Sequence, residues 1–191
     1  MRSKTETITL GSGKLYYSEF TDGTVPANDT LCVDANLLGR IKGGATLTYT
    51  PTFYDASDDM GYVQKSIITD EEAILKSGLI TWNGETLKAL TSTARVTTSA
   101  ATASKPGTRT VKIGGVANND GKKYVLCFHH EDAADGDVWV KIVGTCRSGF
   151  ELTFAKDAET TINAEFKAMP QDDTGTLIEY TEKTANKTSG N

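Results

Sequence analysis

The segment GGATLTYTPTFY, residues 43–54, indicates the fold class of this chain. Its side chains repeat with a period of two, so that one set is mainly apolar and the other set is threonine. The apolar set is Ala45, Leu47, Tyr49, Pro51 and Phe53, and the other set is Thr46, Thr48, Thr50 and Thr52. Because successive side chains of a strand point to opposite faces, the pattern predicts a strand with one apolar and one threonine-coated face. Proline cannot donate a backbone hydrogen bond, so we expect Pro51 at a sheet edge or a bulge.

Strand patterns recur on both sides of this segment, and threonine is abundant throughout. We predict strands over residues 5–10, 13–20, 63–82 (two strands divided near Ser77-Gly78), 108–115, 122–131, 137–146, 149–156, 160–169 and 175–180. Residues 149–156 and 160–169 carry apolar side chains on one face and polar ones on the other, which is typical of sheets that bury a single face. The predicted fold is therefore mainly β, a sandwich or barrel with one flanking α-helix.

The flanking helix is predicted over residues 83–94. Asn83 can cap its first turn, and Leu87, Leu90 and Ala94 follow at helical spacing. Three other segments are predicted to lie outside regular structure. Residues 21–36 form a turn-rich loop, residues 96–108 (VTTSAATASKPGT) form a flexible surface loop, and residues 183–191 form a disordered tail.

The segment YVLCFHHEDAADGDVWVKIV, residues 124–143, places two histidines beside several carboxylates. Adjacent side chains of a strand diverge, so His129 and His130 do not converge on one metal ion. Residues 132–137 instead read as a turn between two strands, and pairing Asp132 with Asp137 places Cys127 opposite Ile142. A metal site that uses His130 with Asp132 remains the alternative.

Composition excludes several classes of function. The net charge of −5 argues against a basic face that grips nucleic acid, and no apolar run is long enough to cross a membrane. Three cysteines without a CxxC pair suggest neither a disulfide framework nor a zinc knuckle. Because no catalytic motif is present either, we expect no enzyme activity, no catalytic or metal-binding residue and no cofactor.

Sheets with two-sided strands have edges, and those edges carry unpaired backbone N–H and C=O groups. A chain with such strands and no enzyme motif can use its edges for assembly. We expect neighbouring copies of the chain to complete these edges and to close a ring whose interior is polar.

Two long runs of the sequence resemble phage major tail tube proteins. The first is GGATLTYTPTFYDASDDMGYVQKSIITDEEAILKSGLITWNGETLKAL, and the second is GKKYVLCFHHEDAADGDVWVKIVGTCRSGFELTFAKDAETTINAEFKAMPQDDTGTLIEYTE. The likeness spans most of residues 5–182 and lies chiefly in TWNG (81–84), KIGG (112–115) and EFKAMPQDDTGTLI (165–178). The type VI secretion tube is similar in architecture.

The resemblance implies a structural virion protein in residues 1–182. Six copies form a ring, rings stack into a tube in the virion's tail, assembly takes place in the host cytoplasm, and DNA passes through the lumen without sequence-specific binding. It implies an N-terminal arm over residues 1–14, an inter-ring loop over residues 54–64, and residues 96–108 on the outside. The inter-ring candidates are Tyr54, Asp55, Asp58, Asp59 and Tyr62.

The implied partners are further copies of the chain, the tape measure, the tail terminator and the tail tip, with no membrane. Glu151 and Glu165 are the candidates for the lumen, because each lies on the polar face of a predicted strand. An acidic or neutral lumen repels phosphate and lets DNA slide.

Two other functions compete with this one. A β-sandwich module that binds carbohydrate or a receptor would use aromatic side chains as a stacking platform, namely Trp82, Trp139, Tyr54 and Tyr62. A metal hydrolase would use His129, His130 and the acids beside them. A glycan array tests the first alternative, and metal analysis of the purified protein tests the second.

Overall fold

The structure is a computed structural model that describes residues 12–21, 23–133 and 136–183. It is mainly β, as predicted. The strands are β1 (Lys14–Glu19), β2 (Leu37–Ser57), β3 (Gln64–Leu79), β4 (Arg95–Ser99), β5 (Thr108–Lys112), β6 (Tyr124–His130), β7 (Val138–Cys146), β8 (Ile162–Met169) and β9 (Glu179–Glu182). The helices are short: α1 (Asn28–Leu31), α2 (Gly84–Ala89) and the 3-10 turns η1 (Asp34–Asn36) and η2 (Val116–Asn118).

Six of the strands close into a barrel. Their order is β6-β1-β2-β3-β8-β7, every neighbouring pair is antiparallel, and β7 pairs again with β6. Strand β9 pairs with the first half of β7, residues 138–141, and β4 with β5 forms a separate two-stranded sheet. The expectation that neighbouring copies complete the sheet edges is therefore wrong for these six strands, because β6 and β7 close the barrel within one chain. Among the described residues, β9 and the strands of the projecting hairpins each keep an edge without a partner strand.

The barrel interior holds the main hydrophobic core. Every second residue of each strand points inward, as the pleat requires, and Leu75, Leu126, Ile142 and Phe166 are almost completely buried there. Helix α2 closes the barrel near one end through Ala89 and through Leu90, which follows the helix. A smaller cluster lies outside the barrel, where α1 covers β1, β6 and β7: Tyr16, Leu31, Val125, Cys127 and Val143.

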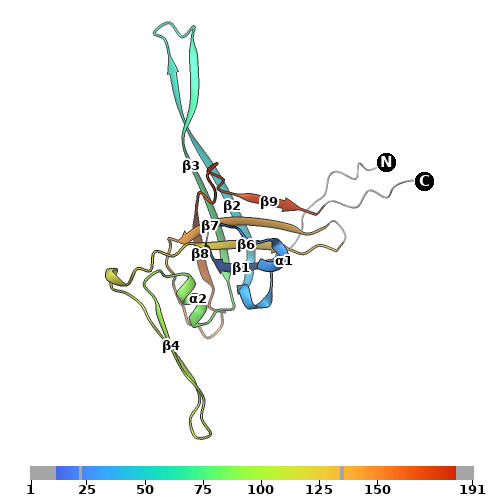
Figure 1. Ribbon diagram of the computed structural model, residues 1–191, viewed down its shortest axis with the longest axis vertical. Coiled ribbons are helices and arrows are strands. Elements are labelled where there is room, and N and C mark those ends of the chain that lie inside the picture. Colours follow the sequence, from blue (N-terminus) through green and yellow to red (C-terminus); the bar gives the residue numbers. More distant parts are fainter. Residues whose placement is uncertain (1–11, 22, 134–135, 184–191) are drawn as a thin grey trace, which may run out of the picture.

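Strands β2 and β3 continue far beyond the barrel as a two-stranded hairpin (Figure 1). The barrel supports β3 only from Ile74 onward, where pairing with β8 begins. From Tyr49 to Ser57 the strand β2 has β3 as its one neighbour, which corresponds to about 30 Å of free hairpin. Pro51 pairs regularly with Glu71 and lies on the edge of β2 that has no described partner strand, as predicted; a register shift follows the next residue, Thr52.

This hairpin corrects two predictions. The loop expected over residues 54–64 is only the hairpin tip, because Tyr54–Ser57 belongs to β2 and Gln64 begins β3. The division expected near Ser77-Gly78 is also wrong, since β3 runs unbroken through both residues. The first error arose because exposed, mostly polar residues were taken for loop, and the second because a Ser-Gly pair was taken for a break, although Ser77 is buried. Cross-strand pairing with β2 keeps both segments extended.

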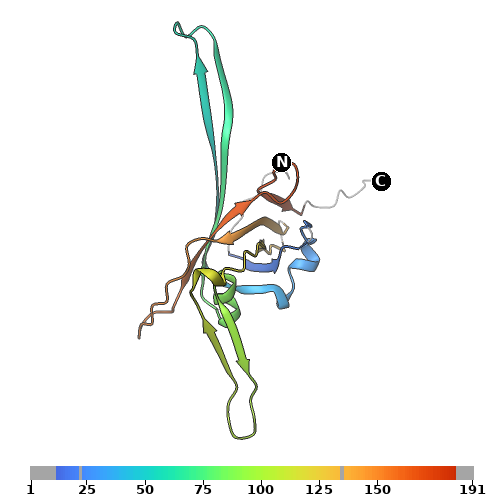
Figure 2. The same cartoon turned by 60° about the vertical axis from the view of Figure 1, so that its left-hand side comes forward.

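Residues 96–108 form a second hairpin and not the flexible loop that was predicted. β4 pairs with β5 along their whole lengths, and Thr102 bridges to Lys105 beyond them. Threonine and valine in both strands favour extended backbone, whereas the small, polar composition had suggested a loop. In Figures 1 and 2 this hairpin points away from the body at the end opposite the β2–β3 hairpin.

The predicted helix and one predicted strand are shorter or absent. Asn83 caps α2 as expected, through a capping box with Thr86, but the helix ends at Ala89 and not at residue 94. Residues 149–156 form no strand, although their side chains alternate. Gly149 has a φ of 65°, which turns the chain out of the sheet, and Phe150 and Leu152 reach the core from irregular backbone. Residues 21–36, predicted as a loop, include α1 and η1.

The register of β6 and β7 differs by one residue from the prediction. His130 pairs with Val138, so Cys127 lies opposite Lys141 and not Ile142. The backbone N–H of Asp132 donates to the side chain of Asp137 at 3.2 Å, so these residues close the turn and do not form a backbone pair. Residues 1–11, which hold most of the predicted N-terminal arm, and residues 184–191 of the predicted tail lie outside the described residues.

Candidate functional site

The most unusual surface of the molecule is the free part of the β2–β3 hairpin. We call residues 51–71, which begin and end at the cross-strand pair Pro51 and Glu71, the long arm. Every residue of the long arm is exposed except Pro51, which is half-buried. Large apolar side chains are nevertheless frequent in it: Phe53, Tyr54, Met60, Tyr62, Val63, Ile67 and Ile68.

These apolar side chains lie on both faces of the long arm. Phe53 pairs with Ile68 on the face that continues the barrel interior, and Tyr54 pairs with Ile67 on the opposite face. Met60 and Tyr62 lie at the tip and are 78% and 84% exposed. Contiguous exposed apolar surface in a soluble domain usually marks a contact with another molecule, so the long arm is a candidate interface.

The tip of the long arm has a defined turn. Asp58 accepts a hydrogen bond from the backbone N–H of Val63 at 2.8 Å, and Gly61 occupies a left-handed conformation. The hydrogen bonds from the backbone lower the pKa of Asp58. All five inter-ring candidates therefore lie on this arm, with Tyr54 and Asp55 in β2 and Asp58, Asp59 and Tyr62 in the turn.

A polar wall covers the outside of the barrel over β2, β3 and β8. Its charged residues form two ion pairs: Lys76 with Glu165 at 2.7 Å, and Lys167 with Glu72 at 2.5 Å. These four charges cancel, and the threonines of β2 extend the wall toward the long arm. Glu165 therefore points outward from the barrel, as its place on the polar face of β8 predicted, but an ammonium group neutralises it.

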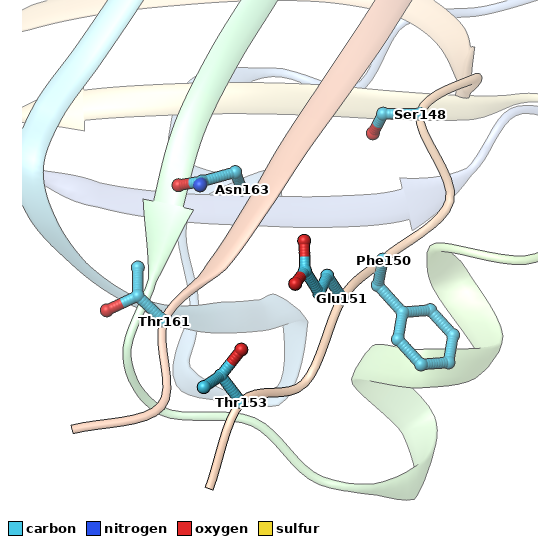
Figure 3. A pocket seen from close by; sticks show the side chains of 6 residues that line it. All are labelled: Ser148, Phe150, Glu151, Thr153, Thr161 and Asn163. Atoms are coloured by element: carbon cyan, nitrogen blue, oxygen red, sulfur yellow. The ribbon is translucent and has the colours of Figure 1, made fainter. Parts of the chain in front are cut away.

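Glu151 lies beside this wall, in the irregular segment that follows β7. It lines a pocket of about 340 Å³ together with Ser148, Phe150, Thr153, Thr161 and Asn163. Figure 3 shows the Glu151 carboxylate turned toward β8, the strand of Asn163, whereas the Phe150 ring turns toward α2. Asn163 and Glu165 share the outward face of β8, so both lumen candidates lie near one surface, although Glu151 does not belong to a strand.

The two histidines diverge, as predicted. The His129 ring stacks on Trp139 with centroids 4.8 Å apart, and burial lowers the pKa of His129. His130 lies 4% exposed on the inward side, where its Nδ1 is 2.7 Å from the carbonyl oxygen of Ser12. Its Nε2 is 4.0 Å from Asp132, and within the described residues no group of three potential ligands surrounds a metal position.

The predicted aromatic platform is dispersed. Trp82 packs against the barrel core and lies 6.3 Å from Phe154, measured between ring centroids. Trp139 packs against the outer cluster, and Tyr54 and Tyr62 lie on the long arm. Because the two tryptophans belong to separate clusters, they do not form one flat surface for a sugar ring.

Sequence reasoning missed two features. The first is the short arm, by which we mean residues 95–112. The strand predicted over residues 108–115 contains β5, but β4 and its pairing with β5 were not predicted, although Val96 and the threonines after it were an available signal. The second is the approach of Cys32 to Cys127, whose sulfur atoms are 3.6 Å apart beneath α1. No local pattern reveals that contact, because the two residues are 95 positions apart.

Comparison with protein-family models gives no match, and comparison with curated proteins gives no significant match. None of the helices within residues 12–21, 23–133 and 136–183 is long and apolar enough to span a bilayer.

Proposed function

We propose that this chain is the structural subunit of a phage tail tube, in which rings of six copies stack around a lumen that conducts the genome. One observation carries the proposal: a complete barrel projects two hairpins from opposite ends, and the longer one exposes apolar side chains that nothing in the described chain covers. Exposing apolar side chains to water is unfavourable in free energy, and association with another copy would bury them. The likeness of the sequence to tail tube proteins supports the same conclusion.

The polar wall suits the inside of such a tube. DNA carries about one negative charge per 1.7 Å of its axis, so a basic wall would hold it. The wall has two ammonium groups and two carboxylates in paired positions, and therefore no net charge. In this proposal Glu165 belongs to the lumen, and Glu151 lies at its margin.

The remaining partners follow from the same proposal. The tube would contact the tape measure, the tail terminator and the tail tip in the virion, and assembly would take place in the host cytoplasm. No catalytic step is required of the chain, and the long arm provides the contact between rings. The open edge of β9 is available to a neighbouring copy in the same ring.

Electron microscopy of the concentrated protein tests the proposal. We expect hollow rings or tubes, and a cross-section with six subunits around a bore lined by the polar wall. Solid aggregates, or particles without a bore over a wide range of protein concentration and ionic strength, would contradict it. Cross-sections that place the polar wall on the outside would contradict the assignment of the lumen alone.

A further inference from the structure

The two arms carry opposite charges. In the long arm, five carboxylates and Lys65 give a net charge of −4 (−5 + 1); the carboxylates are Asp55, Asp58, Asp59, Asp70 and Glu71. The short arm has four basic side chains and no acidic residue, so its net charge is +4; the four are Arg95, Lys105, Arg109 and Lys112. Since the whole chain has a net charge of −5, the remainder has −5 (−5 + 4 − 4).

These charges form no ion pair inside the described part of the subunit, although Asp58, Glu71 and Arg95 each take part in a hydrogen bond. All of the basic side chains of the short arm and all of the carboxylates of the long arm are exposed, and none forms an ion pair with another described residue. Glu72, which lies immediately inside the long arm, does have a partner, because Lys167 is 2.5 Å away. Within the part of the chain that the structure describes, ion pairs therefore occur on the barrel beside the long arm but not on the long arm itself.

The arms cannot neutralise each other within one molecule. Both views show them extending in opposite directions along the longest axis, with the barrel between them (Figures 1 and 2). A long arm can meet a short arm only if the short arm belongs to another copy. Because the two surfaces differ, such a contact is head-to-tail, and it repeats along an axis unless rotation closes it.

We propose that the long arm of each copy docks on the short arm of the next copy along the tube axis, and that charge complementarity sets this polarity. The inference rests on the proposed function and adds to it the pair of surfaces that meet. The end of the short arm carries small side chains, from Ala100 to Ser104, which allow another hairpin to approach closely. Like arms repel, so head-to-head and tail-to-tail contacts are disfavoured.

Ionic strength gives the first test. Both arms are exposed, so their attraction weakens as the Debye length falls from about 10 Å at 0.1 M salt to about 3 Å at 1 M. We expect the initial rate of assembly, followed by light scattering, to fall at least about tenfold between these concentrations. A rate that stays constant or rises with salt overturns the inference.

Charge exchange gives the sharper test. Variant L carries Asp55→Lys, Asp59→Lys and Asp70→Lys, which changes the long arm to +2 (−4 + 6). Variant S carries Arg95→Glu, Lys105→Glu and Lys112→Glu, which changes the short arm to −2 (+4 − 6). Asp58 and Arg109 stay, since Asp58 holds the tip and the Arg109 stem lies beside Gly84.

Each variant alone has two arms of the same sign, so we expect assembly to fall at least about tenfold. A mixture of L and S restores complementarity at both contacts, and so does one chain with all six substitutions. Recovery in the mixture shows that the single variants are folded, which circular dichroism checks independently. If the mixture and the six-fold variant stay as inactive as L or S, the inference is wrong.

A carbodiimide cross-link separates this inference from the proposed function. We expect peptides that join Lys105 or Lys112 of one copy to a long-arm carboxylate of another. If these cross-links form in particles that are not tubes, the arm contact stands and the tail tube fails. If tubes form without these cross-links, the proposed tail tube stands and the arm contact fails. If variant S instead loses affinity for DNA and assembles normally, the short arm is a nucleic-acid contact and the inference is overturned.

Discussion

Removing the long arm should leave the fold intact and abolish assembly. Residues 51–71 can be replaced by Asn-Gly between Thr50 and Glu72, which are cross-strand partners and accept a two-residue turn. The deletion removes two apolar cross-strand pairs, Phe53 with Ile68 and Tyr54 with Ile67, which together contribute about 0.4–2 kcal/mol.

A shorter connection offsets this loss. Reducing the linking segment from 21 residues to 2 lowers the entropy cost of closure by about 2 kcal/mol, from (3/2)RT ln(21/2). The free energy of unfolding should therefore change by less than about 2 kcal/mol, because nothing removed belongs to the barrel core. Urea unfolding in dilute solution, followed by circular dichroism, measures this change, and electron microscopy of the concentrated variant measures assembly.

Two results would refute the reasoning. A loss of more than about 3 kcal/mol would mean that the arm supports the barrel, contrary to its exposure. Tubes of normal appearance would mean that the arm is not the contact between rings. A companion deletion removes residues 100–107 of the short arm, which also spares the barrel core. Because these residues belong to the surface on which the long arm is proposed to dock, this deletion should impair assembly as well.

Three further predictions concern the subunit alone. Replacing Asn83 with Ala removes the cap of α2 and should lower the free energy of unfolding by about 1 kcal/mol, measured by urea unfolding against Asn83→Ser. Replacing Phe166, which is 2% exposed in the barrel, with Ala should lower it by about 3–5 kcal/mol, with Phe166→Leu as a milder control. Hydrogen bonds from Thr176 and Thr174 lower the pKa of Asp172 to about 2. These bonds therefore stabilise the folded state fully above the unfolded pKa of about 3.9, and this stabilisation is lost as the pH falls through about 2. The chemical shift of the Asp172 carboxyl carbon in an NMR titration measures the pKa.

Each of these predictions has a clear contradictory result. Equal stability of the Ala and Ser variants at Asn83 would mean that the capping box contributes nothing. A loss below about 1 kcal/mol at Phe166 would mean that the barrel repacks around the missing ring. A midpoint near 3.9 for Asp172 would show that the turn formed by residues 172–176 does not hold in solution.

The sequence predicted what depends on neighbouring residues. The period of two identified β2 and β8, and it placed Phe166 inward and Glu165 outward because alternation is a property of any paired strand. Asn83 was recognisable as a cap from its side chain alone. The divergence of His129 from His130 followed from the same geometry.

What failed depends on pairing between distant segments. Residues 149–156 alternate like a strand, but β8 pairs with β3 and β7 and offers them no ladder. Residues 96–108 resemble a linker in composition, yet β4 and β5 support each other. Closure of the barrel requires β1 to lie between β6 and β2, and no local pattern specifies that order. The opposite charges of the two arms were visible in the sequence, but their relation was not, because it depends on where the arms point.

Because β6 and β7 close the barrel within one chain, the proposed tube can form from subunits that are already folded. A subunit whose barrel needed a strand from a neighbour would expose open sheet edges until that neighbour bound. At high concentration, such edges could pair in wrong registers. This chain completes its own hydrogen bonding around the core first. If the chain forms the proposed tube, newly made copies can therefore be stored as folded subunits and can join the tube without refolding.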